Sequence, residues 1–112
     1  MMYRAEIQFC GKSILVIKDQ DGTCFLTPVF CENMIDNPTM SMSEYVNHDA
    51  FFLSQITNDR IYCMGYVSVF AAIGYWLHEA AQGNSSAEAL VAACVNEMLQ
   101  WQLNSAKFTR FM

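Results

Sequence analysis

Residues 3–19, YRAEIQFCGKSILVIKD, decide the fold that we expect for this chain. In the first half of this stretch every second side chain is apolar or aromatic, namely Tyr3, Ala5, Ile7 and Phe9. This period of two indicates a β-strand with one buried face. A turn at Gly11 and Lys12 then leads into the apolar, mostly β-branched residues 14–17, which predict a second strand. The chain therefore begins with a predicted antiparallel hairpin.

A second turn is predicted at residues 19–22, DQDG, because Gly accepts a positive φ and Asp hydrogen-bonds its own backbone. Residues 23–30 predict a third strand. Pro28 cannot donate a ladder hydrogen bond, so we expect this strand to lie at a sheet edge or to break there. Residues 1–31 together predict a three-stranded antiparallel β-meander.

The rest of the chain is expected to be a linker followed by helices. Residues 32–42 are the predicted linker, since Asn, Asp, Pro and Ser recur there. The helical part covers residues 43–112. Its first helix begins with Ser43 as N-cap and ends near residue 56, and its second includes the apolar residues 61–77. The third begins at the serines 85–86, which are expected to cap it, and ends near residue 106.

Residues 61–77, IYCMGYVSVFAAIGYWL, carry no charged side chain and therefore raise the question of a membrane span. A bilayer-spanning helix needs about 20 predominantly apolar residues. This run is shorter, contains three Tyr and one Ser, and has no basic cluster at either end. We therefore expect a buried helix rather than a membrane helix. Its small side chains form a stripe that another backbone can approach closely: Gly65, Ser68 and Ala72.

The expected fold class is α+β, with three helices packed on one face of the meander in a single domain of residues 1–112. A hydrophobic content of 54% with 15% charged residues excludes a disordered chain. The aromatic content of 13% is high for so small a core, so we expect a homodimer. The residues predicted for its interface are Gly65, Ser68, Ala72, Phe108 and Phe111.

The cysteines predict a reducing, cytoplasmic setting. Their number is odd, their spacing is irregular, and residues 1–6 lead directly into a strand pattern rather than a secretory leader. Buried structural thiols fit these features better than a disulfide framework. The cysteines are Cys10, Cys24, Cys31, Cys63 and Cys94.

The charge distribution is the main indication of function. Between Lys18 and Arg60 the chain carries seven carboxylates and neither Lys nor Arg. Opposite charge steers association, so we expect a protein partner with a basic surface. Six scattered basic residues give no basic stripe, which argues against direct binding of nucleic acid. The predicted partner-binding residues are Asp19, Asp21, Glu32, Asp36, Glu44, Asp49 and Asp59.

No sequence motif identifies a reaction, a metal or a cofactor. The two histidines, His48 and His78, form no zinc-type spacing with each other or with a cysteine, and DQDG lacks the later ligands of a calcium loop. Cys31 or Cys63 would need an electropositive, open site to act as a nucleophile, and their apolar or acidic surroundings oppose this. We therefore assign no catalytic residue, metal or cofactor.

These observations lead us to expect a non-enzymatic, small acidic protein-interaction module. It would act as an inhibitor or adaptor of the phage or mobile-element type, on a basic surface or a nucleic-acid-binding channel of a larger complex. The alternative is a small enzyme that uses a Cys or a carboxylate with His48 or His78. A third interpretation is that the acids only solvate one face of the domain.

Overall fold

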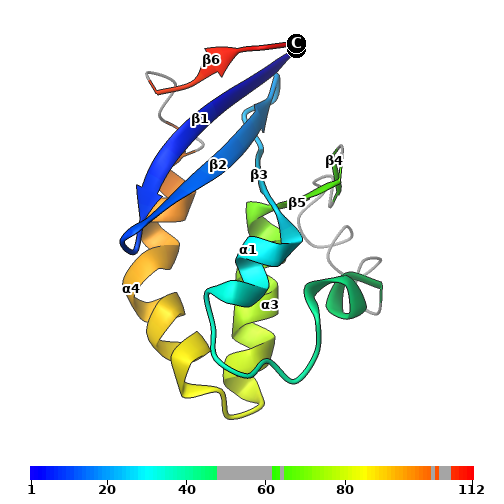
Figure 1. Cartoon of the computed structure of the whole chain (residues 1–112), viewed down its shortest axis with the longest axis vertical. Coiled ribbons are helices and arrows are strands. Elements are labelled where there is room, and N and C mark those ends of the chain that lie inside the picture. The colour runs from blue at the N-terminus through cyan, green and yellow to red at the C-terminus, as the bar shows by residue number, and fades with distance from the viewer. Residues whose placement is uncertain (48–61, 64, 102, 104–106) are drawn as a thin grey trace.

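The computed structural model describes residues 1–47, 62–63, 65–101, 103 and 107–112. It has an α+β fold in which one twisted sheet packs on the helices (Figure 1). The sheet has six strands in the order β4-β5-β3-β2-β1-β6, and each neighbouring pair is antiparallel. The strands are β1 (Met2–Phe9), β2 (Lys12–Asp19), β3 (Cys24–Leu26), β4 (Tyr62–Cys63), β5 (Tyr66–Ser68) and β6 (Thr109–Arg110).

The predicted N-terminal hairpin is present, with β1 and β2 paired along their whole length. Phe9 faces Lys12, so the connecting turn contains only Cys10 and Gly11, with φ of 50° and 78°. Positive φ at both positions is the requirement of the type I′ turn, whose twist matches that of the two strands. The meander predicted for residues 1–31 is incomplete as a description of the sheet, because β5 adds to β3 and β6 adds to β1.

The third predicted strand is wrong in its second half. β3 ends at Leu26, and α1 (Pro28–Asn33) follows within what was predicted as strand and the start of the linker. Thr27 caps this helix, since its hydroxyl oxygen accepts a hydrogen bond from Phe30 N at 3.2 Å. Pro28 takes the first helical position, where its missing N–H needs no partner. The proline thus begins a helix instead of breaking a strand.

The single helix predicted to include residues 61–77 is also wrong at its start. The described residues 62–63 and 66–68 are β4 and β5, and α3 (Val69–Ala81) begins only afterwards. Gly65 lies in the turn between these strands with φ of 83°, and Ser68 is the last residue of β5. The stripe of small residues on one helix therefore does not form, because Ala72 is its only member within α3.

The end of the chain also differs from the prediction. α4 (Ser85–Trp101) ends earlier than residue 106, and β6 follows it in the part predicted to be helical. Asn84, rather than the predicted serines, caps α4: its side-chain oxygen accepts from Ser86 N at 3.1 Å and from Ala87 N at 3.3 Å. Across the described parts of the chain, none of the helices combines the length and the apolar character needed to cross a bilayer.

The first predicted helix is seen in part, as a helical segment over residues 42–47. It is capped by Ser41 instead of Ser43, because the Ser41 hydroxyl accepts from Glu44 N at 3.0 Å. Tyr45 packs its ring against Tyr75 and His78 of α3, with centroid distances of 5.7 and 5.5 Å. The continuation predicted to residue 56 lies outside the described residues.

The core lies between the helices and the sheet face that carries Ala5, Ile7 and Phe9. Trp76 of α3 is fully buried there, and its Nε1 donates to the carbonyl of Cys31 at 2.8 Å. Phe9 meets Trp101 of α4 edge to face at 5.2 Å between ring centroids. These contacts join the hairpin and the helices α1, α3 and α4 into one hydrophobic cluster. The opposite sheet face has a smaller buried cluster of Met2, Ile17 and Phe25.

Candidate functional site

The charged residues divide between two regions of the molecule. Every Lys or Arg in the described residues belongs to the hairpin or to the C-terminal segment, namely Arg4, Lys12, Lys18, Lys107 and Arg110. The described residues 28–47 and 65–101, which include all helices, contain neither Lys nor Arg. The asymmetry seen along the sequence therefore becomes an asymmetry in space, between a helical part and a basic sheet edge.

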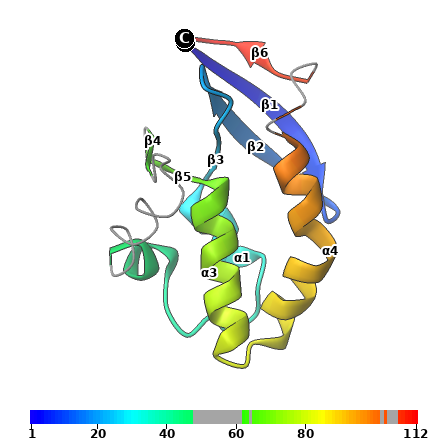
Figure 2. The ribbon, with the colours of Figure 1, turned by 180° about the vertical axis from the view of Figure 1, so that it is seen from behind.

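The loop that follows α1 passes beside the α3–α4 connection and then leads into the segment 42–47, and acids of the helical part lie along these pieces (Figures 1 and 2). Hydrogen bonds join these pieces: Asp36 bonds to Asn84 and Ser86, and Glu32 bonds to the backbone of Met42. We call this region the acidic end. Its carboxylates, half-buried in the first case and exposed in the others, are Glu32, Asp36, Glu44 and Glu88.

Two of the predicted acids lie far from this region. Asp19 ends β2 opposite Met2, and the β2–β3 turn shares a surface depression with Tyr3, Lys18 and Phe108. Asp19 is buried, and its Oδ1 accepts from Asp21 N at 2.9 Å and from Thr23 N at 3.0 Å. These bonds shape the turn, so the hairpin acids belong to the basic side of the molecule. Asp49 and Asp59 lie outside the described residues.

Buried or partly buried acids hold the acidic end together. Glu32 Oε1 accepts from Met42 N at 2.7 Å and so fixes the start of the segment 42–47. Glu79 is fully buried and accepts from Thr39 N at 2.6 Å and from the Thr39 hydroxyl. A carboxylate that receives backbone and hydroxyl donors fixes the loop that carries them. These two acids therefore position the loop that follows α1 rather than present charge to a partner.

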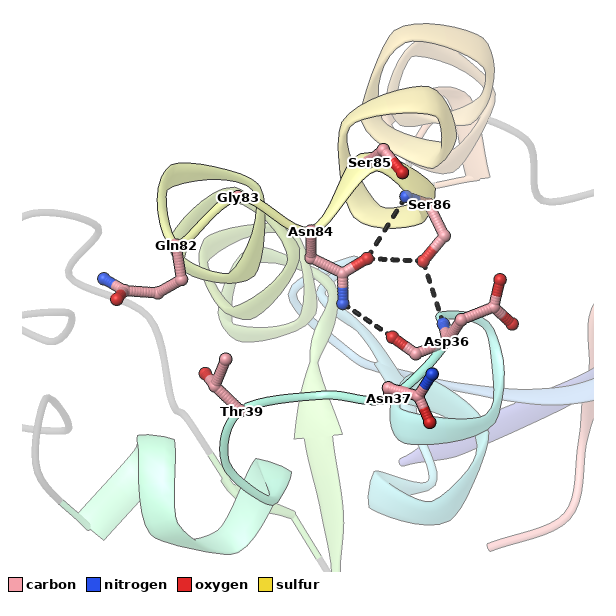
Figure 3. A pocket seen from close by; sticks show the side chains of 8 residues that line it. All are labelled: Asp36, Asn37, Thr39, Gln82, Gly83, Asn84, Ser85 and Ser86. Atoms are coloured by element: carbon pink, nitrogen blue, oxygen red, sulfur yellow. Dashed lines mark hydrogen bonds between the residues drawn. The ribbon is translucent and has the colours of Figure 1, made fainter.

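A polar hollow with a volume of about 310 Å³ lies at the acidic end (Figure 3). Asn84 Nδ2 donates to the carbonyl of Asp36 at 2.7 Å, and Ser86 Oγ accepts from Asp36 N at 2.8 Å. Ser86 Oγ also donates to Asn84 Oδ1 at 2.6 Å. The residues that line the hollow are Asp36, Asn37, Thr39, Gln82, Gly83, Asn84, Ser85 and Ser86.

The network fixes the backbone of Asp36 on both sides while its carboxylate points away from the bonded groups (Figure 3). An exposed carboxylate on a fixed backbone loses little conformational freedom when it meets a cationic group. Asp36 is thus an exposed charge on a backbone that hydrogen bonds hold on both sides. The arrangement suits recognition of an Arg or Lys side chain better than it suits acid–base chemistry.

Sequence reasoning missed Glu79 and Glu88, although a signal for them was available. Residues 61–106 contain no Lys or Arg, which makes them a second stretch without basic residues. Glu97 belongs to the same stretch but lies beside Lys107, with which it lines a depression at the other end of α4. The acidic end thus combines acids from both stretches.

The buried thiols of Cys24 and Cys31 are not activated nucleophiles. Burial raises the pKa of Cys24 from 9.0 to about 11, although nearby Lys18 partly opposes this. Burial, and then the charge of Glu32, raises the pKa of Cys31 well above its usual range. Protonated thiols of this kind are poor nucleophiles near neutral pH. The side chains of Cys63 and His48 lie outside the described residues, and His78 faces the ring of Tyr45.

The described residues contain no group of three His, Cys, Asp or Glu side chains that could hold a metal ion.

The residues predicted for a dimer interface are not brought together. Ser68 and Ala72 are buried inside the chain, and Gly65 is exposed in the β4–β5 turn. Phe108 and Phe111 lie beside cations, with Lys18 Nζ 4.8 Å and Arg4 Cζ 5.6 Å from the respective ring centroids.

The comparisons with known proteins give no relative from which a role could be transferred. No family model, no curated protein and no solved structure matches this chain. A functional argument therefore rests on the charges and contacts of the chain itself.

Proposed function

We propose that this protein is a small, non-enzymatic interaction module that binds a basic protein surface through its acidic end. The observation that carries the proposal is the composition of that end. Asp36, Glu44 and Glu88 are exposed there, and the described residues 28–47 and 65–101 supply no Lys or Arg to neutralise them. Such a surface attracts Arg and Lys groups and repels other acidic surfaces.

The internal hydrogen bonds support this proposal because they order the acidic end before a partner arrives. Glu79 fixes the loop at Thr39, and Asn84 and Ser86 fix it at Asp36. A preordered surface avoids much of the entropy loss that binding otherwise requires. In a complex, the Asp36 carboxylate is expected to accept a bidentate pair of hydrogen bonds from an arginine.

The separation of charge also supports an oriented approach to the partner. Arg4, Lys107 and Arg110 lie along the β1–β6 edge, away from the acidic end. This separation of charge gives the molecule an electric dipole. The field of a basic partner orients the dipole so that the acidic end faces the partner, which raises the association rate. A basic channel that normally holds nucleic acid is a suitable target, and occupation of that channel is how an inhibitor or adaptor would act.

The test is affinity capture with full-length protein from an extract of the organism that encodes it. The variant Asp36→Asn/Glu88→Gln removes two charges from the acidic end. The matched control, Glu6→Gln/Asp21→Asn, removes two exposed charges elsewhere. The expected result is that the wild type and the control retain a basic partner that the acidic-end variant loses.

Salt provides the second arm of the experiment. The Debye length falls from about 10 Å at 0.1 M ionic strength to about 3 Å at 1 M, so capture of the partner should decline over this range. Equal loss of the partner by both double variants would show that only net charge matters. That result, or capture that is indifferent to salt, would refute a role for the acidic end.

We also propose a cytoplasmic setting and a homodimer. Cys10, Cys24, Cys31 and Cys94 form no disulfide, and all of these but Cys10 are buried, as expected in a reducing compartment. Exposed apolar side chains such as Val29, Leu77 and Leu103 offer contact area for a second copy. Light scattering after size exclusion should give twice the chain mass of 12.7 kDa. The mass of a monomer at all accessible concentrations would contradict the dimer.

A further inference from the structure

Cys10 occupies an unusual position for a cysteine. It is the first residue of the type I′ turn between β1 and β2, it is exposed, and its φ is 50°. Asn, Asp and Gly are the residues that this position favours, because few other side chains accept a positive φ at low cost. Backbone conformation therefore gives no reason for a cysteine here, and the turn presents its thiol at the surface.

Cys94 lies beside this turn, on the buried side of α4. Cys10 is near enough to Cys94 to raise the pKa of the Cys94 thiol, after the larger effect of burial. Trp101, two helical turns beyond Cys94 on the same face, packs edge to face against Phe9, the residue before Cys10. Both ribbon views place the β1–β2 turn against the middle of α4 (Figures 1 and 2). The two cysteines are thus part of a packed interface between the hairpin and α4.

We propose that Cys10 and Cys94 are a redox modification site, at which a peroxide converts the two thiols into a reversible disulfide between the hairpin turn and α4. The bond links points that are 84 residues apart in the sequence. It requires no approach of distant elements, since the turn that carries Cys10 already packs beside α4, and Phe9 already contacts Trp101. This inference does not depend on the proposed binding of a basic partner.

Exposure sets the order of the chemistry. The thiolate of Cys10 attacks one oxygen of hydrogen peroxide, the O–O bond breaks, and Cys10 sulfenic acid and hydroxide form. The sulfur of Cys94 then attacks the sulfenic sulfur and displaces its oxygen as water, while the hydroxide takes up the proton lost by Cys10. In sum, two thiols and one hydrogen peroxide give one disulfide and two water molecules. A dithiol reductant reverses the bond by thiol–disulfide exchange.

Cys94 is suited to the second step and not to the first. It is 5% exposed, and burial, followed by the neighbouring Cys10, raises its pKa to about 12. A protonated, buried thiol reacts slowly with peroxide, yet it traps a sulfenic acid formed beside it. Cys24 and Cys31 are equally buried but have no such neighbour among the described cysteines, so they serve as internal controls.

The experiment uses reduced, full-length protein treated with graded hydrogen peroxide. Remaining thiols are then alkylated in denaturant, and non-reduced peptides are identified by mass spectrometry. The expected product is one cross-linked peptide pair that joins Cys10 to Cys94 and is two hydrogens lighter than the two reduced peptides. Dithiothreitol should abolish it, and Cys24 and Cys31 should remain alkylated.

The decisive variant is Cys10→Asn, because Asn fits the positive φ of the turn while it removes the thiol. It should fold, lose the cross-link completely, and leave Cys94 reduced at peroxide levels that oxidise the wild type. The variant Cys94→Ser, with the buried thiol replaced, should leave Cys10 as a sulfenic acid that a dimedone-type reagent labels. Oxidation of Cys10 without a bond to Cys94 in the wild type, or a bond to another cysteine, would overturn the proposal.

Discussion

The hydrogen bonds between Glu79 and Thr39 should make Glu79→Gln strongly destabilising. The carboxylate of Glu79 accepts from both the backbone N–H and the hydroxyl of Thr39. Glutamine keeps the shape of the side chain, but it has one acceptor oxygen and one NH₂ group. The glutamine oxygen can still accept from Thr39 N, but the hydroxyl of Thr39 must turn to accept from the NH₂ group, so its own proton loses its acceptor and both bonds lose the charge of the carboxylate.

The size of the effect follows from these two losses. A hydrogen bond to a charged group contributes about 1.5–3 kcal/mol, and a neutral bond about 0.5–1.5 kcal/mol. Because Thr39 is itself exposed, water replaces part of the loss. We expect Glu79→Gln to lower the free energy of unfolding by about 2 kcal/mol, which lowers Tm by about 8 °C in a domain of this size.

A double-mutant cycle in urea isolates the interaction. Thr39→Val removes the hydroxyl, so only the backbone N–H at this position still needs an acceptor, and the glutamine oxygen can supply it. In this background Glu79→Gln should lower the free energy of unfolding by only about 1 kcal/mol, which gives a coupling of about 1 kcal/mol. Glu97→Gln, at an exposed position on α4, is the matched control and should change stability by less than about 0.5 kcal/mol. A coupling within the roughly 0.3–0.5 kcal/mol scatter of independent sites would refute the reasoning.

Three further changes test other parts of the structure. Asn84→Ala removes the cap of α4 and should destabilise by about 1–2 kcal/mol in urea unfolding, whereas the neighbouring Ser85→Ala should have almost no effect. Trp76→Phe leaves the buried carbonyl of Cys31 without its indole donor and should cost about 1–3 kcal/mol; unchanged stability would contradict the core contact. The raised pKa of Cys24 means that the unfolded chain loses this proton first, so stability should fall as pH rises from 9.0 to about 11. Cys24→Ala should reduce that fall in pH-dependent unfolding, and an identical pH profile in the variant would count against the burial of the thiol.

The hairpin was predictable because its signals are local. Alternation over residues 3–9 places Ala5, Ile7 and Phe9 on one face, and the short turn at Cys10 and Gly11 leaves one register. The α+β class follows from the same pattern and from the capped helical segments. Local propensity and tertiary structure agree in this part of the chain.

The strands after the hairpin were not predictable for a physical reason. In residues 61–77 every position is uncharged, so no polar face distinguishes a period of two from a period of 3.6. β5 is a strand because it pairs with β3, a contact made by residues more than 40 positions away. β6 has two residues and no pattern at all, and it exists only because β1 offers an edge. Pairing between distant segments decides these elements.

The acids show the same limit at the level of the site. The sequence shows that these side chains are negatively charged, but it does not show whether they are exposed to solvent. Asp19 and Glu79 therefore could not be distinguished from Asp36. Structure separates them: Asp19 shapes a turn, Glu79 holds a loop, and Asp36 is exposed. The exposed part of the charge asymmetry is therefore smaller than the sequence suggests, and it includes Glu88, which was not predicted as a site residue.

The direct passage from β5 into α3 has a consequence for how this chain tolerates insertions and deletions. Ser68 is both the last residue of the strand and the cap of the helix, with its Oγ accepting from Ala71 N at 3.1 Å. No loop residue lies between β5 and α3, so an insertion or deletion here cannot be accommodated by a change in a loop. One inserted residue would rotate α3 by about 100° relative to the sheet and turn Trp76 away from the core. Sequence length at this joint is therefore expected to stay constant even where the amino acids change.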